Sequence, residues 1–201
     1  MQKIPDHPPG DDGKSASDNA VQVHGPGTKE GIDARCQTRQ VNLIQFKLNG
    51  EPCSVAAPTH WTLLELLRYS LGLTGSKQGC DKGDCGACTV RLDGLPILSC
   101  IYLAIHAHGH DVQTVEGLGV GGDPHPLQDA FDQCGAAQCG FCTPGILMSA
   151  ANLLDRKQAA STSDLTRQEV AEALGGNLCR CTGYTKILDA VEMAWTKLAK
   201  E

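Results

Sequence analysis

The sequence predicts an α+β fold, in which a small mixed sheet crossed by one helix precedes a bundle of four helices. Two observations lead to this prediction. In residues 41–116, short apolar segments flank the hairpin dipeptides Asn49-Gly50 and Asp93-Gly94. In residues 117–201, helix-start signals and helical apolar spacing replace the alternating pattern. We therefore expect two domains at 41–116 and 117–201, preceded by a tail at 1–40.

The tail at residues 1–40 has a composition that predicts disorder. It contains four prolines, five glycines and five aspartates, and no Leu, Phe, Trp or Tyr. Such a stretch cannot bury enough apolar surface to offset the entropy that it would lose on ordering. We therefore expect it to be disordered.

The first domain is predicted to contain five strands and one helix. Residues 41–48 alternate apolar and polar side chains over most of their length, and Asn49-Gly50 predicts the turn into a return strand. Thr62 and Glu65 form a capping box, which opens a helix with a leucine-rich apolar face. The predicted strands are 41–48, 53–56, 89–92, 95–98 and 112–115.

The second domain is predicted to be helical throughout. Thr143-Pro144 places a capping residue before a proline at the first helical position. Thr166 and Glu169 form another capping box, and Gly175-Gly176 ends the helix that they open. A polar loop is expected at 156–163. The predicted helices are 127–134, 144–154, 167–174 and 185–200.

Composition and charge exclude several classes of protein. The net charge is −6, from 17 Lys and Arg against 23 Asp and Glu, and no basic run suggests nucleic acid. No segment reaches the roughly 20 consecutive apolar residues of a membrane span. The N-terminus lacks the apolar segment of a signal peptide. We therefore expect a cytoplasmic protein. Because the cytosol keeps thiols reduced, its eleven cysteines favour metal or redox use over disulfides.

The strongest chemical signal is the spacing C-x4-C-x2-C at Cys80, Cys85 and Cys88, followed by Cys100. This is the spacing of a plant-type [2Fe–2S] ferredoxin loop. The interleaved glycines predict tight turns with positive φ, which point N–H groups at the sulfur atoms. A structural zinc site is the alternative, but zinc fingers do not usually have this spacing. These glycines are Gly79, Gly83 and Gly86.

A second cysteine set combines Cys139-x2-Cys142 with Cys179-x-Cys181. Each half precedes a predicted helix, whose N-terminal N–H groups and positive potential suit an anionic thiolate cluster. Spacing alone leaves zinc open for this set. Four plus four thiolates suffice for two binuclear clusters, which would make the chain an electron carrier.

Other patterns carry weaker signals. Cys36 lies in the tail, and we interpret Cys53 and Cys134 as buried or incidental thiols. The run 117–122 fits G-x-G-x-x-G, but Pro124 and Pro126 delay the next helix, and neither the acidic residue nor the second parallel strand of a dinucleotide site follows, so we interpret it as a linker. The three histidines of 106–110 lie at the end of a second, short helix that we expect at 101–107, and histidines are favourable near a helix C-terminus without a metal.

Three segments together resemble a known family. Residues 79–88, 138–145 and 176–184 are similar to the iron–sulfur subunit of molybdenum hydroxylases, the xanthine oxidase family. This family includes the small subunit of carbon monoxide dehydrogenase, aldehyde and xanthine dehydrogenases, and the gamma subunit of 4-hydroxybenzoyl-CoA reductase. The resemblance covers 41 to about 195. It implies a β-grasp ferredoxin-like [2Fe–2S] domain followed by a four-helix-bundle [2Fe–2S] domain, and it largely removes the zinc alternative.

The resemblance also implies roles for individual residues. Gln138 and Cys181 match positions that contact the pterin of a molybdopterin cofactor, and the first cluster is expected to face FAD. Both cofactors would be held by partners in a heterotrimer, on a large molybdopterin-binding subunit and a medium FAD-binding subunit. No catalytic residue is expected in this chain. The implied ligands are Cys80, Cys85, Cys88 and Cys100 for the first cluster, and Cys139, Cys142, Cys179 and Cys181 for the second.

The sequence therefore predicts the electron-transfer subunit of an oxidoreductase complex, which relays electrons between molybdopterin and FAD through two [2Fe–2S] clusters. The alternatives are a free-standing two-cluster carrier and a zinc-stabilised interaction module. Gln138 favours the complex, since a free carrier needs no pterin contact. Two departures from the family are the tail at 1–40 and a longer stretch before Cys179, which we place in the loop at 156–163.

Overall fold

The computed structural model describes residues 41–119, 121–160 and 164–199. The predicted disordered tail at 1–40 lies outside the described residues, as does Cys36. Within the described residues, no helix is long and apolar enough to cross a membrane.

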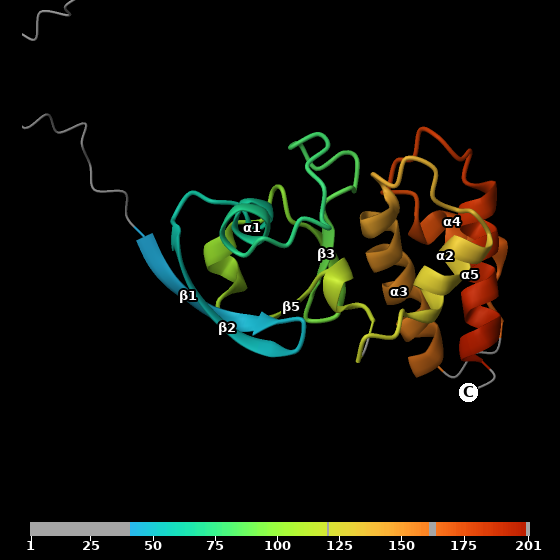
Figure 1. The fold of residues 1–201 in the computed structure, drawn as a ribbon, viewed down its shortest axis with the longest axis horizontal. Helices are drawn as coiled ribbons and strands as arrows, with labels where there is room; N and C mark the ends of the chain where they lie inside the picture. The colour runs from blue at the N-terminus through green and yellow to red at the C-terminus, as the bar shows by residue number, and fades with distance from the viewer. Residues whose placement is uncertain (1–40, 120, 161–163, 200–201) are drawn as a thin grey trace, which may run out of the picture. The chain divides into compact units, whose positions relative to one another are not determined.

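A five-stranded mixed sheet forms the first part of the described chain, in the order β2-β1-β5-β3-β4 (Figure 1). Strand β1 pairs antiparallel with β2 and parallel with β5, whereas β3 pairs antiparallel with both β4 and β5. Both predicted hairpins are present, and their turn residues have positive φ, as a two-residue turn of this kind requires. The strands are β1 (Val41–Leu48), β2 (Glu51–Pro58), β3 (Thr89–Leu92), β4 (Leu95–Leu98) and β5 (Asp111–Gln113).

One helical segment crosses this sheet, and it begins at the predicted capping box. The Thr62 hydroxyl accepts the N–H of Glu65, whose carboxylate accepts the N–H of Thr62. Only α1 (Leu63–Glu65) is α-helical, because the chain continues as the π-helical turn η1 (Leu66–Ser70). The helical segment buries its leucines against the sheet. This core contains Ile44, Phe46, Leu63, Leu66, Leu67, Val90 and Val112.

The connection between β4 and β5 differs from the prediction. The predicted helix at 101–107 is only the 3-10 turn η2 (Ala104–Ala107). Strand β5 ends at Gln113, and the 3-10 turn η3 (Val115–Gly117) follows it. The predicted extension of this strand to Val115 is therefore wrong.

Four helices follow, as predicted, and they share a second apolar core. They are α2 (Pro126–Gln133), α3 (Thr143–Ala159), α4 (Arg167–Ala173) and α5 (Thr185–Leu198). Thr143 is the first residue of α3 and Cys142 is its N-cap, so the predicted cap is wrong by one position. The core contains Leu127, Phe131, Ile146, Met148, Leu154, Val170, Ile187, Val191 and Trp195.

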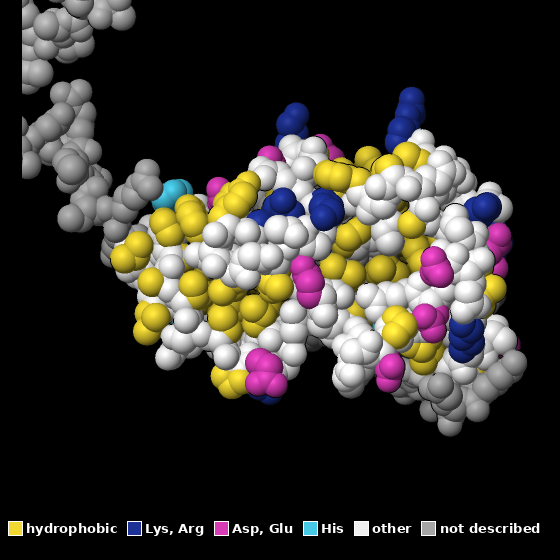
Figure 2. All heavy atoms as spheres, in the orientation of Figure 1, with side chains coloured by type: hydrophobic (Ala, Val, Ile, Leu, Met, Phe, Trp, Pro, Cys, Tyr) yellow, Lys and Arg dark blue, Asp and Glu magenta, His cyan; other side chains and the backbone are white. Residues whose placement is uncertain are grey.

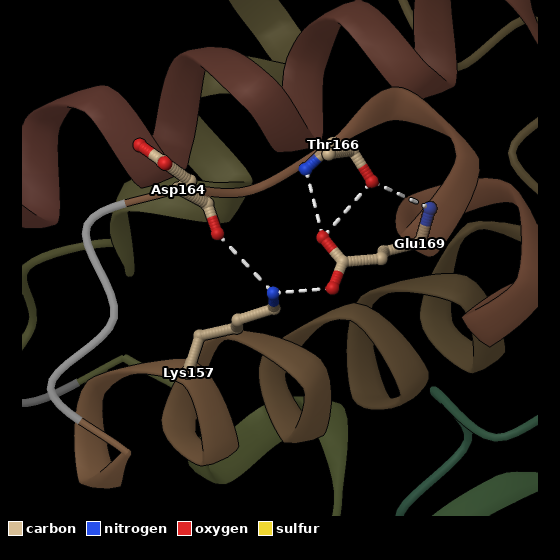
Figure 3. A network of polar contacts seen from close by, with 4 residues as sticks. All are labelled: Lys157, Asp164, Thr166 and Glu169. Atoms are coloured by element: carbon tan, nitrogen blue, oxygen red, sulfur yellow. Dashed lines mark hydrogen bonds and ion pairs between the residues drawn. The ribbon is translucent and has the colours of Figure 1, made fainter.

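The connection between α3 and α4 is held by a polar network (Figure 3). Lys157 donates to Glu169 at 2.5 Å and to the carbonyl oxygen of Asp164 at 3.2 Å. Glu169 also completes the predicted capping box with Thr166. These contacts explain why α4 begins where the sequence predicts. The predicted polar loop at 156–163 is wrong for residues 156–159, which belong to α3, and residues 161–163 lie outside the described part.

Helix α3 packs against β3 (Figure 1). Arg91 on β3 pairs with Asp155 on α3 at 2.6 Å, and the Asn152 side-chain amide donates to the carbonyl oxygen of Gly94 at 2.6 Å. These contacts join the sheet to the helices. At the start of α3, Gly145 lies against the carbonyl oxygen of Gly86 in the loop before β3.

Candidate iron–sulfur sites

The first cysteine set lies in the loop between η1 and β3, with Cys100 just after β4. Its four thiols form two contacting pairs, Cys80 with Cys85 and Cys88 with Cys100. Cys88 and Cys100 are buried, whereas Cys80 and Cys85 are partly exposed. The structure therefore brings together all four residues predicted for this site.

The loop points backbone N–H groups at the outer pair. The N–H groups of Lys82 and Asp84 donate to the sulfur of Cys80 at 3.5 and 3.4 Å. Hydrogen bonds from the loop backbone lower the pKa of Cys80 to about 7, which favours its thiolate. Burial raises the pKa of Cys85. Burial and the contact with Cys88 raise the pKa of Cys100 to about 11.

The glycines of this loop act in two ways. Gly83 and Gly86 have the predicted positive φ, at 80° and 72°. Gly79 does not, so that part of the prediction is wrong. A Cβ atom at Gly79 would instead lie 2.8 Å from the sulfur of Cys85. Gly79 is therefore needed for the space beside the thiol.

The second cysteine set also forms two contacting pairs. The sulfur atoms of Cys139 and Cys181 lie 3.5 Å apart, and the thiols of Cys142 and Cys179 contact each other. The first pair is exposed and the second is partly exposed. The two halves of the set lie immediately before α3 and just before α5, so the fold brings together residues about 40 positions apart.

Local hydrogen bonds favour one thiolate in each pair of the second set. The backbone N–H of Phe141 lowers the pKa of Cys139, and the contact with Cys139 raises the pKa of Cys181. Burial, followed by the contact with Cys179, raises the pKa of Cys142 to about 12. Burial opposes ionisation of Cys179, but hydrogen bonds led by that of Thr182 outweigh it and lower its pKa.

Sequence reasoning missed the residues that hold Cys179. The hydroxyl of Thr182 lies 3.2 Å from the sulfur of Cys179. The Tyr184 hydroxyl accepts the N–H of Cys179 at 2.8 Å and donates to the carbonyl oxygen of Asn177 at 3.0 Å. Tyr184 has a left-handed backbone, with φ of 65°, which is uncommon for a bulky residue. The dense motif around Cys179 was the only signal in the sequence for these contacts.

The paired arrangement fits two binuclear clusters. A [2Fe–2S] cluster takes four thiolates, two on each iron, and each set offers two pairs. Among the described residues, no three His, Cys, Asp or Glu side chains converge as they would on one metal ion. Thiolates together with backbone N–H groups directed at sulfur are the donor set that iron–sulfur clusters prefer. The residues present therefore fit the group that the sequence predicts.

Gln138 is exposed in the bend just before Cys139, and its amide has no polar partner among the described residues. Two apolar side chains of the same region are also exposed, Phe141 by 46% and Leu178 by 58%. Figure 2 shows hydrophobic side chains at the surface above β3 and α3, between two projecting basic side chains. Exposed apolar groups beside a functional loop are typical of a surface that meets a partner.

The remaining candidates have ordinary structural roles. Cys53 lies in β2, and the sulfur of Cys134 lies 3.9 Å from that of Met193. His108 accepts the backbone N–H of Gln45 at 3.1 Å. The other two histidines of 106–110 also have partners, a tyrosine ring and a carboxylate. These contacts agree with the interpretation of the histidines as structural.

Comparisons with known proteins agree with this geometry. Residues 46–104 match the family described as "2Fe-2S iron-sulfur cluster binding domain", and residues 114–192 match "[2Fe-2S] binding domain". The chain is 45% identical over 156 residues to the nicotinate dehydrogenase small FeS subunit of Eubacterium barkeri. The aligned region covers 78% of this chain and 96% of that protein. It is also 45% identical over 148 residues to the xanthine dehydrogenase iron-sulfur-binding subunit of Escherichia coli O157:H7, covering 74% and 91%.

Solved structures show the same fold. A chain of quinoline 2-oxidoreductase from Pseudomonas putida 86 superposes with a TM-score of 0.74 at 42% identity, covering 80% of this chain and 97% of that chain. The aldehyde oxidoreductase of Desulfovibrio desulfuricans ATCC 27774 superposes with a TM-score of 0.73 at 41% identity. The superposed region covers 79% of this chain but only 17% of the aldehyde oxidoreductase chain, so the fold forms part of a longer chain in the aldehyde oxidoreductase.

Proposed function

This chain belongs to the iron–sulfur subunits of the molybdenum hydroxylases, and we propose that it relays electrons between a molybdopterin centre and FAD through two [2Fe–2S] clusters. The observation that carries this proposal is the presence of two cysteine sets, each gathered as two thiol pairs. When bound, each cluster accepts and releases one electron at a time. No substrate chemistry is expected from this chain alone.

Eight residues would hold the two clusters. The chain contributes thiolates and N–H groups directed at sulfur. The first site is the more enclosed, because two of its thiols are buried, whereas the second exposes two thiols. The proposed ligands are Cys80, Cys85, Cys88 and Cys100 in the first site, and Cys139, Cys142, Cys179 and Cys181 in the second.

We assign residues 41–116 to a β-grasp ferredoxin-like domain and residues 117–201 to a four-helix-bundle domain, with 1–40 as a tail. The sheet order and the four helices support this assignment. The two separate apolar cores also support it, since a domain is expected to have its own core.

The partners that we propose are a large molybdopterin-binding subunit and a medium FAD-binding subunit, in a cytoplasmic heterotrimer. Several relatives are named as subunits of dehydrogenases. The exposed thiols of Cys139 and Cys181, together with the unpartnered amide of Gln138, support docking of the pterin at this end of the second site. The first site would then face the flavin. A free-standing carrier is not favoured, because it would leave this surface without a use.

The proposal is tested by co-expressing the chain with its two partners and analysing the purified complex. We expect the three subunits to purify together with molybdopterin, FAD and iron. Gln138→Leu should leave the iron content unchanged and slow reduction of the nearer cluster by substrate, because the amide no longer holds the pterin. Gln133→Leu is the matched control, since Gln133 is also exposed but lies on α2. Equal rates in both variants would exclude a pterin contact by Gln138.

A further inference from the structure

The two cysteine sets are joined by a direct backbone hydrogen bond. The N–H of Leu178 donates to the carbonyl oxygen of Cys85 at 2.8 Å. Cys85 belongs to the first set, and Leu178 is bonded to Cys179 of the second. The route from one thiol to the other therefore runs through Cys85, one hydrogen bond, Leu178 and Cys179. Electrons pass more readily along such bonded routes than across open space.

Two glycines, Gly86 and Gly145, allow the two loops to approach this closely. A Cβ atom at Gly86 would lie 2.2 Å from the carbonyl oxygen of Gly176. A Cβ atom at Gly145, in the first turn of α3, would lie 2.2 Å from the carbonyl oxygen of Gly86. Any side chain at Gly86 or Gly145 would push backbone against backbone. The separation of the two loops is thus set by direct backbone contact.

The buried side-chain amide of Asn177 holds the two cysteine loops against each other. The side chain of Asn177, 4% exposed, donates to the carbonyl oxygen of Gly86 at 2.9 Å and to the hydroxyl of Thr89 at 3.2 Å. Its oxygen accepts the hydroxyl of Ser149 at 2.7 Å. One side chain therefore ties the first cysteine loop, strand β3 and helix α3 to the segment that carries Cys179. A fully bonded buried polar group of this kind favours one arrangement over its neighbours.

We propose that Asn177 is a positioning residue, which fixes the separation and the electronic coupling of the two clusters by keeping the Leu178–Cys85 bridge closed. The inference rests on the proposed function, because it requires both clusters to be bound. Asn177 contacts no predicted ligand through its side chain. It acts by holding the residues on either side of the bridge in register.

The same interface offers a matched control. Asn152 on α3 is also buried, and its amide donates to the carbonyl oxygen of Gly94 at 2.6 Å. It joins the same two parts of the chain, but at the turn between β3 and β4, away from both cysteine loops. A general loosening of the interface would follow from changing either asparagine. A change in cluster coupling should follow only from Asn177.

The test uses the full chain with both clusters loaded. Asn177→Leu and Asn152→Leu are compared with the unmodified protein by iron content and by electron paramagnetic resonance of the fully reduced state. In Asn177→Leu we expect normal iron content and both signals, but a smaller magnetic interaction between the two clusters. Redistribution of an electron between them after flash photoreduction should be slower than in the unmodified protein, because the Leu178–Cys85 hydrogen bond is no longer held closed. Asn152→Leu should change neither quantity.

The outcomes separate this inference from the proposed function. An unmodified chain without two clusters overturns the function itself. Normal iron with unchanged interaction and rate in Asn177→Leu overturns only the role of Asn177, as do equal changes in Asn152→Leu. If Asn177→Leu loses iron, Ser149→Ala decides the matter, because it removes one of the contacts that orient the amide and leaves Asn177 in place. A smaller loss of coupling in Ser149→Ala supports the role of Asn177, and unchanged coupling overturns it.

Discussion

The substitution Gly145→Ala tests whether the two cysteine loops are as close as the structure places them. In an ordinary helix this change is stabilising, since alanine is favoured over glycine by up to about 1 kcal/mol. Gly145 is buried in the first turn of α3, and its added Cβ would lie 2.2 Å from the carbonyl oxygen of Gly86. That neighbour is backbone, so relief requires the loop or the helix to move. Overpacking of this kind costs roughly 1–3 kcal/mol.

The gain in helix propensity offsets part of this cost, so we expect a net destabilisation of up to about 2 kcal/mol. For a chain of this size, that loss lowers the midpoint of thermal unfolding by up to roughly 8 °C. Unfolding of the cluster-loaded protein is followed by circular dichroism and by the visible absorption of the clusters.

Gly176→Ala is the matched control for this prediction. Gly176 lies across the same contact, but a Cβ atom there meets nothing within 4 Å and its φ is not positive. Its midpoint should stay the same or rise slightly. A midpoint that rises in Gly145→Ala, as it would in an ordinary helix, would refute the close approach of the two loops.

Three further predictions concern the ligands, the second cluster and the polar network. Cys85→Ser should remove the spin signal of the first cluster and leave that of the second. Cys142→Ser should remove the signal of the second cluster and leave that of the first. Two normal signals in either variant would disprove the ligand assignment. Thr182→Val should lower the reduction potential of the second cluster by about 30–60 mV, because it removes a hydrogen bond that stabilises the more negative reduced state, whereas Thr182→Ser should keep it. The polar network lowers the pKa of Glu169 to about 2, so its contribution to stability is present above the unfolded pKa near 4.5 and is lost as the pH falls toward 2. The difference in chemical denaturation between unmodified protein and Glu169→Gln should therefore be largest near neutral pH and shrink in acid, and a difference that is constant with pH would contradict this role.

The sequence predicts those elements whose signals are local. Asn49-Gly50 and Asp93-Gly94 adopt the positive φ of tight hairpins, because few other dipeptides do so at low cost. The Thr166–Glu169 capping box likewise marks the start of α4, since donor and acceptor lie within one turn. Such features require no knowledge of the rest of the fold.

The errors occur where tertiary contacts decide the local structure. The segment after Glu65 becomes π-helical at η1, with the N–H of Leu71 bonded to the carbonyl oxygen of Leu66. No propensity distinguishes this turn from an ordinary helix in the sequence. The segment at 101–107 has helical composition but forms only a 3-10 turn. Its length is set by its place between two strands, which the composition does not encode.

The candidate sites follow the same division. Cysteine spacing alone pointed to the first site, whose C-x4-C-x2-C run is local, whereas the family resemblance assigned the two halves of the second set, about 40 positions apart, to one cluster. The role of Asn177 could not be predicted, since its partner Gly86 lies 91 residues away. Only the folded chain shows that this amide bonds the first cysteine loop to the segment before Cys179.

The most direct test of the central claim is a metal and spin count on the anaerobically purified chain. Two [2Fe–2S] centres require about four iron atoms and about four acid-labile sulfides per chain. Full reduction should then give two distinct paramagnetic signals, each integrating to one spin per chain. Stoichiometric zinc with little iron, or a single signal at full iron loading, would contradict the account.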